Sequence, residues 1–441
     1  MKKTFLFAAV TALCLAFSGC SVFETDTEAL MHPPLLSEEQ EKLNAALTEV
    51  AGENFTLKYP KTGEMNSAFI FEDLDNDGED EAMAFYSSVD ESTRINILKK
   101  SGDGWISVYE AAGFSGEMES IDFIQMKNGA PVLFVKWPGE IGIYSFENDR
   151  LETVYSAACD GTDIVDMNAD GFSEIVVFKG TAMSRSFLSV IYYDGNEVVS
   201  TEEISVHAEY DSIISAKVGD FGNGKYAYFV DSFVYEEVFL TEMFVLEEGE
   251  VERFTVADFV VYEDENEKEP EAESGTIIII GGNLGKRGIF LRNTGVYCLD
   301  TNGDGVMEFP VEVREDYATE ASDELYYIQY MQLVDEEAKV AWNGIANTQN
   351  GYIFAVPAAW NERATLSFNS LDNEMVFIDK ETSRVIFKIC MSEKSDYQDK
   401  FEDYVLVAED ETRNFYVKSF VEPEDNFYLD PELYEKCFIF I

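Results

Sequence analysis

The sequence has little of the chemistry that most catalytic and metal sites use. Only two of its 441 residues are histidine, and His32 lies in an N-terminal segment typical of a tether. A Ser–His–Asp or Cys–His site would therefore depend on His207, and no supporting motif accompanies it. Zinc sites with several histidines or paired CxxC motifs are absent from the sequence. We expect His207 to be a hydrogen-bonded or solvated side chain, and we expect no catalytic residues.

Basic residues are also scarce. The chain has 31 Lys and Arg against 86 Asp and Glu, which gives a formal net charge of −55. Binding of nucleic acid needs a cationic surface, so we expect no nucleic-acid partner. A peripheral grip on anionic lipid is disfavoured for the same reason. Apolar residues still make up 46% of the chain, enough for substantial hydrophobic cores.

Long apolar runs are confined to the N-terminus, and no later stretch reaches a membrane-spanning length. The order MKK, TFLFAAVTALCLAF and SGC predicts a signal peptide over residues 1–19. The cysteine after Ser18-Gly19 resembles a bacterial lipobox, with Phe17 where leucine is usual, so Cys20 would be lipidated. An ordinary signal peptide with an incidental cysteine is the alternative. We expect an extracytoplasmic protein anchored to the bacterial cell membrane through Cys20 alone.

Cysteines are few after processing. Cys390 and Cys437 lie in the same C-terminal part and can pair, whereas Cys159 and Cys298 precede acidic loops at unequal offsets. Four buried thiols is the interpretation we favour.

The most distinctive stretch is DLDNDGEDEAMAFY. Positions one, three, five, six and nine of this loop are Asp73, Asp75, Asp77, Gly78 and Glu81. Carboxylates spaced by two around a tight turn can converge on Ca²⁺, which takes about six to eight oxygen ligands. An EF-hand is excluded because position twelve is Ala84, not a bidentate glutamate. The flanks SAFIFE and AMAFYSS also predict strands rather than helices.

The loop recurs twice. The same five positions hold Asp166, Asn168, Asp170, Gly171 and Glu174 in DMNADGFSE, and Asp300, Asn302, Asp304, Gly305 and Glu308 in DTNGDGVME. Apolar runs flank both copies, GTDIV and IVVFK around the second and GVYCL and FPVEV around the third. Asp, Asn and Gly also make ordinary turns, but a turn does not require this spacing together with Glu at position nine. We therefore expect three calcium loops between strands.

Two further segments are typical of the same strand–turn–strand unit without an ion. They are SIDFIQMKNGAPVLFVKW around Asp122 and SIISAKVGDFGNGKYAYFVD around Asp220. The first positions then recur at intervals of 49, 44, 54 and 80 residues, and the last interval contains an acidic run, 263–274, typical of an exposed insertion. Sheets that repeat every ~40–50 residues indicate propeller blades.

The three loops resemble the calcium loops of FG-GAP or VCBS repeats, which build β-propellers in integrin-type and bacterial surface proteins. The resemblance covers roughly 58–340 and implies up to three structural Ca²⁺ ions. The side-chain ligands it implies are Asp73, Asp75, Asp77, Glu81, Asp166, Asn168, Asp170, Glu174, Asp300, Asn302, Asp304 and Glu308. It also implies ligation by the backbone carbonyls of Glu79, Phe172 and Val306. The Phe-Gly and Gly-Ala-Pro elements of the family stand unpaired, at Phe221 and Gly129, which leaves the number of blades open.

These features divide the chain into a signal peptide (1–19), a lipidated tether with a short amphipathic helix (20–57), the propeller (58–345) and a C-terminal domain (346–441). The helix should begin at a capping box of Ser37 and Gln40 and bury Leu43, Ala46, Leu47 and Val50. The C-terminal domain is typical of short strands with one or two helices. The fold class we expect is mainly β, an FG-GAP-like β-propeller with calcium-binding loops followed by a small β-rich α+β domain.

The function we expect is binding or adhesion, with a protein or an envelope glycan as the ligand. The alternatives are a calcium-dependent polysaccharide lyase or hydrolase, and a structural scaffold in a membrane complex. Three tryptophans are expected in the core, with stacking on sugars as the alternative: Trp105, Trp137 and Trp360.

Overall fold

The computed structural model describes residues 38–87, 93–112, 117–180, 186–207, 209–222, 224–235, 238–254, 260–261, 278–279, 289–292, 294–301, 303–313, 325–334, 337–361, 363–369, 371–395 and 401–440. The expected signal peptide with Cys20, the tether with His32, Ser37 and the acidic run 263–274 lie outside these residues. No helix that the structure describes is long and apolar enough to cross a membrane.

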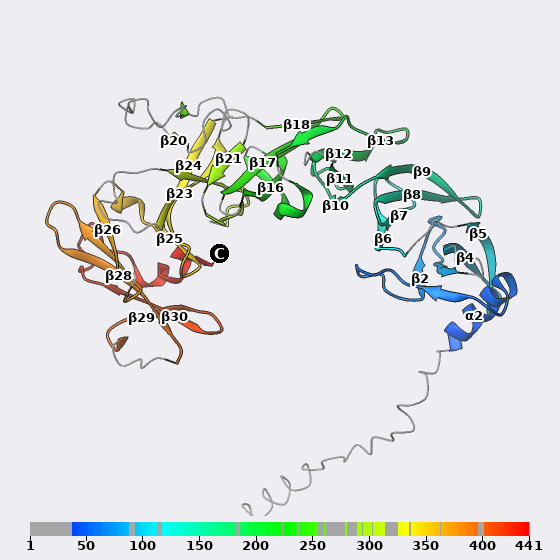
Figure 1. Ribbon diagram of the computed structural model, residues 1–441, viewed down its shortest axis with the longest axis horizontal. Helices are drawn as coiled ribbons and strands as arrows, with labels where there is room; N and C mark the ends of the chain where they lie inside the picture. The colour runs from blue at the N-terminus through cyan, green and yellow to red at the C-terminus, as the bar shows by residue number, and fades with distance from the viewer. Residues whose placement is uncertain are drawn as a thin grey trace, which may run out of the picture. The chain divides into compact units, whose positions relative to one another are not determined.

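The described residues form two compact units. One comprises 38–59, 67–72 and 80–112, and the other comprises 60–66, 73–79 and 117–440. Both consist mainly of antiparallel sheet, and Figure 1 colours the strands by chain order.

The first unit is one five-stranded antiparallel sheet covered by a helix. Its strands are β1 (Thr56–Lys58), β2 (Phe69–Glu72), β3 (Glu81–Ser87), β4 (Thr93–Ser101) and β5 (Gly104–Ala112). Both β1 and β2 pair with β3, which continues through β4 to β5. Helix α2 (Glu38–Ala51) places Leu43 and Leu47 in one core with Leu98 and Trp105 of this sheet.

The second unit contains five larger sheets among its described residues. The first sheet contains β6 (Ser120–Ile124), β7 (Val132–Trp137), β8 (Glu140–Glu147) and β9 (Arg150–Ala158). The second contains β10 (Gly161–Val165), β11 (Glu174–Gly180), β12 (Ser186–Tyr193), β13 (Val198–Ser200) and β14 (Ile204–Val206). The third contains β15 (Ile213–Gly222), β16 (Lys225–Tyr235), β17 (Val238–Glu247), β18 (Glu250–Arg253) and β21 (Ile289–Arg292). In these sheets β14 joins β12, and β21 joins β17, beside a meander of consecutive strands.

The last two sheets of this unit are also antiparallel, with five strands each. The fourth sheet contains β22 (Phe309–Val313), β23 (Leu325–Val334), β24 (Glu337–Asn347), β25 (Tyr352–Val356) and β31 (Phe438–Phe440). The fifth contains β26 (Ala364–Asn369), β27 (Glu374–Asp379), β28 (Val385–Glu393), β30 (Arg413–Ser419) and β29 (Val405–Glu409). A short parallel pair is formed by β19 (Val260–Val261) and β20 (Ile278–Ile279). All six larger sheets of the two units are antiparallel and resemble blades in their four- or five-stranded form.

Consecutive sheets of the second unit share hydrophobic cores, so its middle sheets are covered on both faces. In β11, Ile175 and Val177 belong to a core shared with the β6–β9 sheet, whereas Val176 and Phe178 belong to a core shared with the β15–β18 sheet. Alternate side chains of a strand point to opposite faces, so a strand buried on both faces is a continuous apolar run. Two-sided burial therefore explains the IVVFK run of the sequence.

The same relation holds along the rest of the unit. Tyr228 and Phe229 are neighbours in β16, yet they belong to the cores on opposite sides of their sheet. Phe354 and Phe377 lie in the core that joins the last two sheets, with ring centroids 5.4 Å apart.

Two hairpins have two-residue turns with positive φ at both positions. These residues are Asn148 (53°) and Asp149 (58°) between β8 and β9, and Glu248 (51°) and Gly249 (83°) between β17 and β18. This turn geometry matches the right-handed twist of the strands and fixes the register of both hairpins.

Most strands expected from the sequence are confirmed, including those of the units at Asp122 and Asp220. The expected boundary between residues 345 and 346 falls inside β24, and β31 pairs with β25 of the same sheet. The described residues after 346 contain short 3₁₀ turns, such as Ala358–Trp360, and no α-helix, so this part is more purely β than expected.

Helix α2 is confirmed, but the prediction for Val50 is wrong. Its side chain is 47% exposed, because Ala51 and Phe55 complete the core at this end of the helix. The tryptophans are core residues and therefore cannot stack on a sugar at the surface: Trp105, Trp137 and Trp360. The cysteines of the described chain are free thiols, buried except for the half-buried Cys437: Cys159, Cys298, Cys390 and Cys437.

Candidate functional site

Each of the three acidic loops leads into a strand. The first joins β2 to β3, the second joins β10 to β11, and the third leads from an isolated bridge at Leu299 into β22. Positions four and six have positive φ in each loop: Asn76 and Gly78 (58° and 94°), Ala169 and Gly171 (57° and 91°), Gly303 and Gly305 (78° and 87°). Glycine at position six removes the steric cost of this reversal.

The carboxylate at position one organises each turn. Asp73 accepts hydrogen bonds from the N–H groups of Asp77 (3.0 Å) and Gly78 (2.9 Å). Asp166 and Asp300 accept the equivalent pairs, at 3.1 and 2.9 Å and at 3.2 and 2.9 Å. The three loops therefore have the same backbone path.

The position-five carboxylate also makes the same hydrogen bond in all three loops. In each loop it accepts from the N–H of the position-seven residue, at 2.9, 2.9 and 2.8 Å, and these donors are Glu79, Phe172 and Val306. In the second loop the Asn168 amide donates to Asp170 at 3.2 Å. Asn302, the equivalent of Asn168, lies outside the described residues.

The position-nine glutamate is buried in all three loops, with 2%, 4% and 0% exposure for Glu81, Glu174 and Glu308. Glu174 accepts from the N–H of Met167 at 2.7 Å. Burial raises the pKa of Glu174 to about 7 and raises the pKa of Glu308 above its ordinary value, and nearby aspartates add to both shifts. A cation in the loop would oppose these shifts, because it favours the charged carboxylate.

Two of the loops bring three carboxylates together. The oxygens of Asp73, Asp75 and Glu81 lie within 4.8 Å of one another, and the same is true of Asp300, Asp304 and Glu308. Oxygens this close are suitable ligands for a hard cation such as Ca²⁺. The described carboxylates of the second loop do not form such a group, and the amide oxygen of Asn168 accepts from the N–H of Asp170 at 2.9 Å.

In the third loop, Glu308 has hydrogen-bond partners that the sequence analysis did not predict. Glu308 accepts from both the N–H (2.8 Å) and the hydroxyl (2.6 Å) of Thr301, and Trp342 donates its Nε1–H to the same hydroxyl. Trp342 in turn stacks on Tyr330, with centroids 4.4 Å apart. The signal in the sequence was threonine at position two, where the other loops have the buried side chains of Leu74 and Met167.

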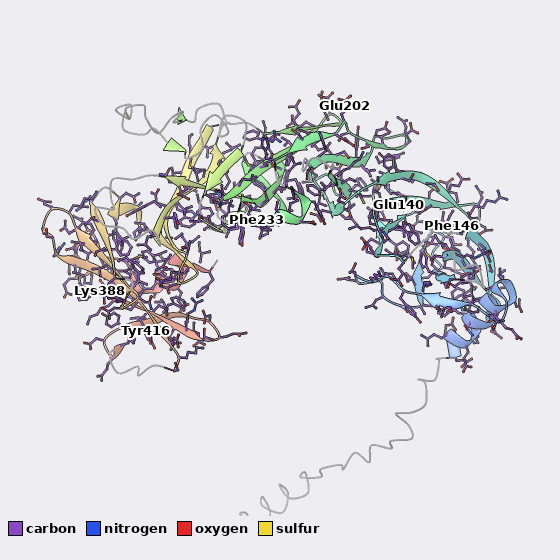
Figure 2. The ribbon with its side chains drawn as sticks, in the orientation of Figure 1. Glu140, Phe146, Glu202, Phe233, Lys388 and Tyr416 are labelled. Atoms are coloured by element: carbon purple, nitrogen blue, oxygen red, sulfur yellow. The ribbon has the colours of Figure 1, made fainter. Side chains whose placement is uncertain are left out.

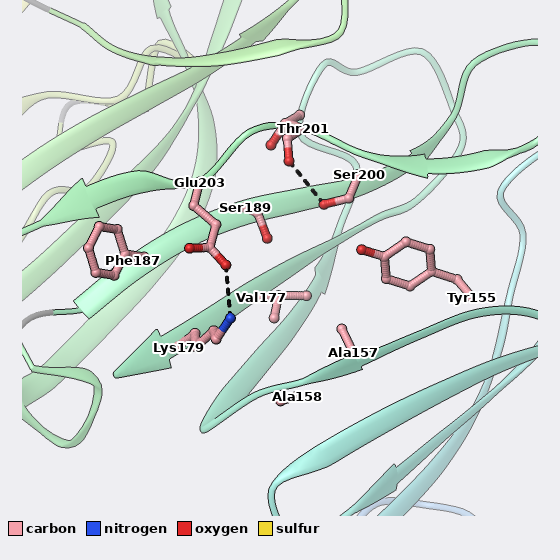
Figure 3. A pocket seen from close by; sticks show the side chains of 10 residues that line it. All are labelled: Tyr155, Ala157, Ala158, Val177, Lys179, Phe187, Ser189, Ser200, Thr201 and Glu203. Atoms are coloured by element: carbon pink, nitrogen blue, oxygen red, sulfur yellow. Dashed lines mark hydrogen bonds and ion pairs between the residues drawn. The ribbon is translucent and has the colours of Figure 1, made fainter. Parts of the chain in front are cut away.

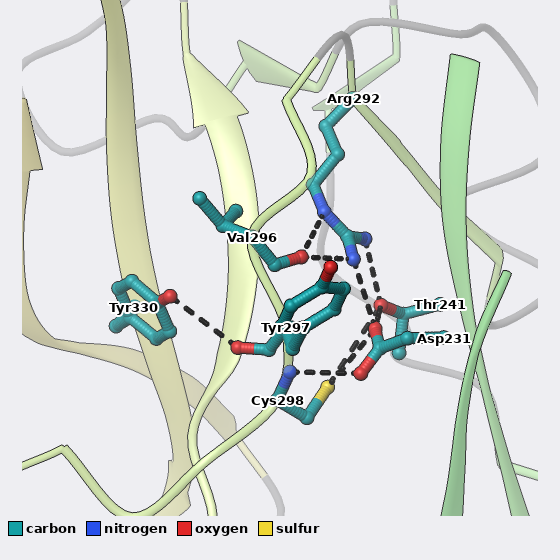
Figure 4. Close-up of polar contacts among 7 residues, drawn as sticks. All are labelled: Asp231, Thr241, Arg292, Val296, Tyr297, Cys298 and Tyr330. Carbon is teal, nitrogen blue, oxygen red and sulfur yellow. Dashed lines mark hydrogen bonds and ion pairs between the residues drawn. The ribbon is translucent and has the colours of Figure 1, made fainter. Parts of the chain in front are cut away.

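A buried polar cluster holds the chain that enters this loop (Figure 4). Arg292 contacts Asp231 at 2.9 Å, and it donates to the Thr241 hydroxyl and to the Val296 carbonyl, both at 2.7 Å. The N–H of Cys298 donates to the second oxygen of Asp231 at 2.9 Å. Burial raises the pKa of the Cys298 thiol, so this thiol is a neutral core group rather than a nucleophile.

The turn of the unit at Asp220 lies close to β23. Asp220 accepts from the N–H of Gly222 at 2.7 Å, and a Cβ at Gly222 would overlap the carbonyl of Leu333.

The prediction that His207 is hydrogen-bonded is confirmed. Its Nδ1 lies 3.2 Å from the fully buried Glu242, and its backbone N–H donates to the same carboxylate at 3.0 Å. Arg253 lies 2.8 Å from Glu242 and supplies the permanent positive charge.

A separate hollow of about 320 Å³ lies between β9 and the β10–β14 sheet (Figure 3). Tyr155, Ala157 and Ala158 come from β9, and Lys179 and Ser189 come from β11 and β12. The hollow is large enough for a small ligand and combines aromatic, hydroxyl and charged groups.

Comparisons with known proteins leave the family open. No family model matches the chain, and no curated protein is significantly similar to it. The chain is similar to solved structures of Sqt1 from Chaetomium thermophilum (TM-score 0.28, 10% identity, 76% of this chain and 72% of that chain) and from Saccharomyces cerevisiae (TM-score 0.28, 8% identity, 84% and 99%). Likenesses at this TM-score carry no argument about function.

Proposed function

We propose that the protein is a lipid-anchored extracytoplasmic binding protein, with an FG-GAP-like β-propeller that up to three calcium ions brace. Its ligand is a protein or a cell-envelope glycan, and its contact with the membrane is the lipid on Cys20. The observation that supports this proposal is the repeated loop, in which the position-one and position-five carboxylates accept hydrogen bonds from equivalent backbone N–H groups each time and the position-nine glutamate is buried. Such a frame holds oxygen ligands in place before a cation arrives.

The test is retention of the chain from Ser21 onward on cell-envelope material of the source organism, first in calcium and then in chelator. Retention that chelator reverses supports a calcium-ordered binding protein, and fractionation of the envelope then identifies the ligand. No retention in calcium contradicts an envelope glycan and directs the search to protein partners. Release of sugar fragments during retention would show that the enzyme alternative is right.

A matched pair of variants separates the loops from the overall acidity. One combines Asp77→Asn, Asp170→Asn and Asp304→Asn, because asparagine keeps the oxygen that accepts from position seven but removes the charge. The control removes the same number of charges from exposed acids outside the loops: Glu140→Gln (Figure 2), Glu152→Gln and Glu247→Gln. Only the loop variant should lose retention.

A further inference from the structure

The hollow beside β9 exists because the edge of the neighbouring sheet is interrupted. Strands β13 and β14 both pair with β12, and Thr201 lies in the break between them. Thr201 donates its N–H to the Val190 carbonyl at 2.9 Å, and its hydroxyl accepts the Val190 N–H at 3.0 Å. A side chain thus replaces a backbone carbonyl in the ladder, and the edge leaves its regular path as it does at a bulge. On the opposite wall Ala157 and Ala158 are too small to fill the space.

The polar groups of this hollow are available to a ligand. Lys179 and Glu203 form an ion pair at 3.1 Å, and their side chains are 49% and 48% exposed. A pair this exposed is worth little, so both groups can exchange partners at small cost. Among the described residues the structure gives the hydroxyls of Tyr155 and Ser189 no hydrogen-bond partner.

We propose that this hollow binds a neutral saccharide ring. This inference rests on the proposed binding function and specifies the class of glycan that the protein would bind. The carboxylate and the ammonium group neutralise each other, and the acidic surface of the chain repels phosphates and other anions. A fatty or purely aromatic ligand would leave the hydroxyls unpaired. A sugar ring offers hydroxyls to Glu203, Lys179 and Ser189, and its apolar face can lie on Tyr155.

The test is saturation-transfer NMR of the chain from Ser21 onward with the methyl glycosides of glucose, galactose, mannose and N-acetylglucosamine, and with methyl glucuronide as the anionic comparison. At least one neutral glycoside should bind. Ser189→Phe, which fills the hollow, and Glu203→Gln, which replaces one carboxylate oxygen by an NH2 group and removes the charge, should each weaken that binding by about tenfold or more. Lys61→Met is the control, because it breaks the similarly exposed Lys61–Glu117 pair (2.7 Å) outside the hollow.

Three results would overturn the inference: no neutral glycoside binds, the glucuronide binds better, or Glu203→Gln binds as tightly as the unaltered chain. Because Glu203 is exposed, its variant keeps the test decisive even where Ser189→Phe does not fold. Envelope retention is measured in the same preparations. Retention without glycoside binding would contradict this inference and leave the proposed function in place. Glycoside binding without envelope retention would support this inference and contradict the proposed binding to the envelope.

Discussion

Glu308 is a buried carboxylate whose effect on stability should depend on whether an ion occupies its loop. Burial raises its pKa, so in a loop without a cation its charge destabilises the folded state. In a loop with calcium the same charge is a ligand. Removal of the charge should therefore destabilise the protein in calcium but not in chelator.

We expect Glu308→Gln in chelator to leave the free energy of unfolding unchanged or to raise it by up to about 1 kcal/mol, because the amide oxygen still accepts from Thr301. In calcium the variant should lose about 1.4 kcal/mol or more, the equivalent of tenfold weaker ion binding. Urea unfolding in both conditions measures the difference, with the exposed Glu250→Gln as control. An equal loss in both conditions would mean that Glu308 is only a hydrogen-bond acceptor.

Arg292 makes a prediction that does not involve calcium. Arg292 is 1% exposed, and Arg292→Met would leave Asp231 as a buried charge without its cation. We expect a loss of about 3–5 kcal/mol in urea unfolding, because an unpaired buried charge is costly. Addition of Asp231→Asn should restore part of this loss. Lys61→Met, which breaks an exposed ion pair, should change stability by less than about 1 kcal/mol. A loss at Arg292 as small as that of the control would refute the role of the cluster.

At the scale of elements, the local pattern of apolar residues predicted most strands, because a strand buried on both faces is a continuous apolar run in the sequence. GVYCL is as apolar as GTDIV, yet it forms no regular strand. Its residues Val296 and Cys298 are held by Arg292 and Asp231 instead. Asp231 lies 67 residues away from Cys298 in the chain, so no window of local sequence contains this information.

The candidate sites divide in the same way. The spacing of oxygen-bearing residues was enough to predict the three loops, because the candidate ligands of each loop lie within nine consecutive residues. The hollow was not predicted, because it needs residues of several strands and the break at Thr201. The Thr301–Trp342 hydrogen bond also joins residues that are far apart, 41 positions along the chain.

The closing strand β31 gives a prediction at this scale. Phe438 lies 5.3 Å from Tyr352 and 5.6 Å from Phe354, between ring centroids, and belongs to the edge of the core shared by the last two sheets. We expect Phe438→Ala to cost roughly 2 kcal/mol in urea unfolding, below the 3–5 kcal/mol of a fully buried phenylalanine because the ring is half-buried. Leu371→Ala, at a side chain 94% exposed, is the control. Equal midpoints for both variants would contradict a packing role for β31.

At the scale of the whole molecule, the excess of acids affects stability through every charge at once. With 86 acidic and 31 basic residues, repulsion acts across the surface and any salt reduces it. A gain in stability with calcium is therefore ambiguous unless general screening is separated from binding at the loops. The two differ in form, since binding saturates with concentration and depends on the identity of the cation.

We expect calcium to raise the melting temperature in a saturable way above the gain from sodium chloride of equal ionic strength. At 100 times the dissociation constant, one occupied loop contributes about 2.7 kcal/mol. Magnesium should do less, because it demands near-octahedral geometry and gives up water reluctantly. The loop variant with Asp77→Asn, Asp170→Asn and Asp304→Asn should keep the gain from sodium chloride and lose the saturable part, whereas its charge-matched control should keep both. Differential scanning calorimetry of the unaltered chain and of both variants measures these responses. Equal shifts from calcium and sodium chloride, or a saturable gain that survives in the loop variant, would show that the acidic loops are turns and not ion sites.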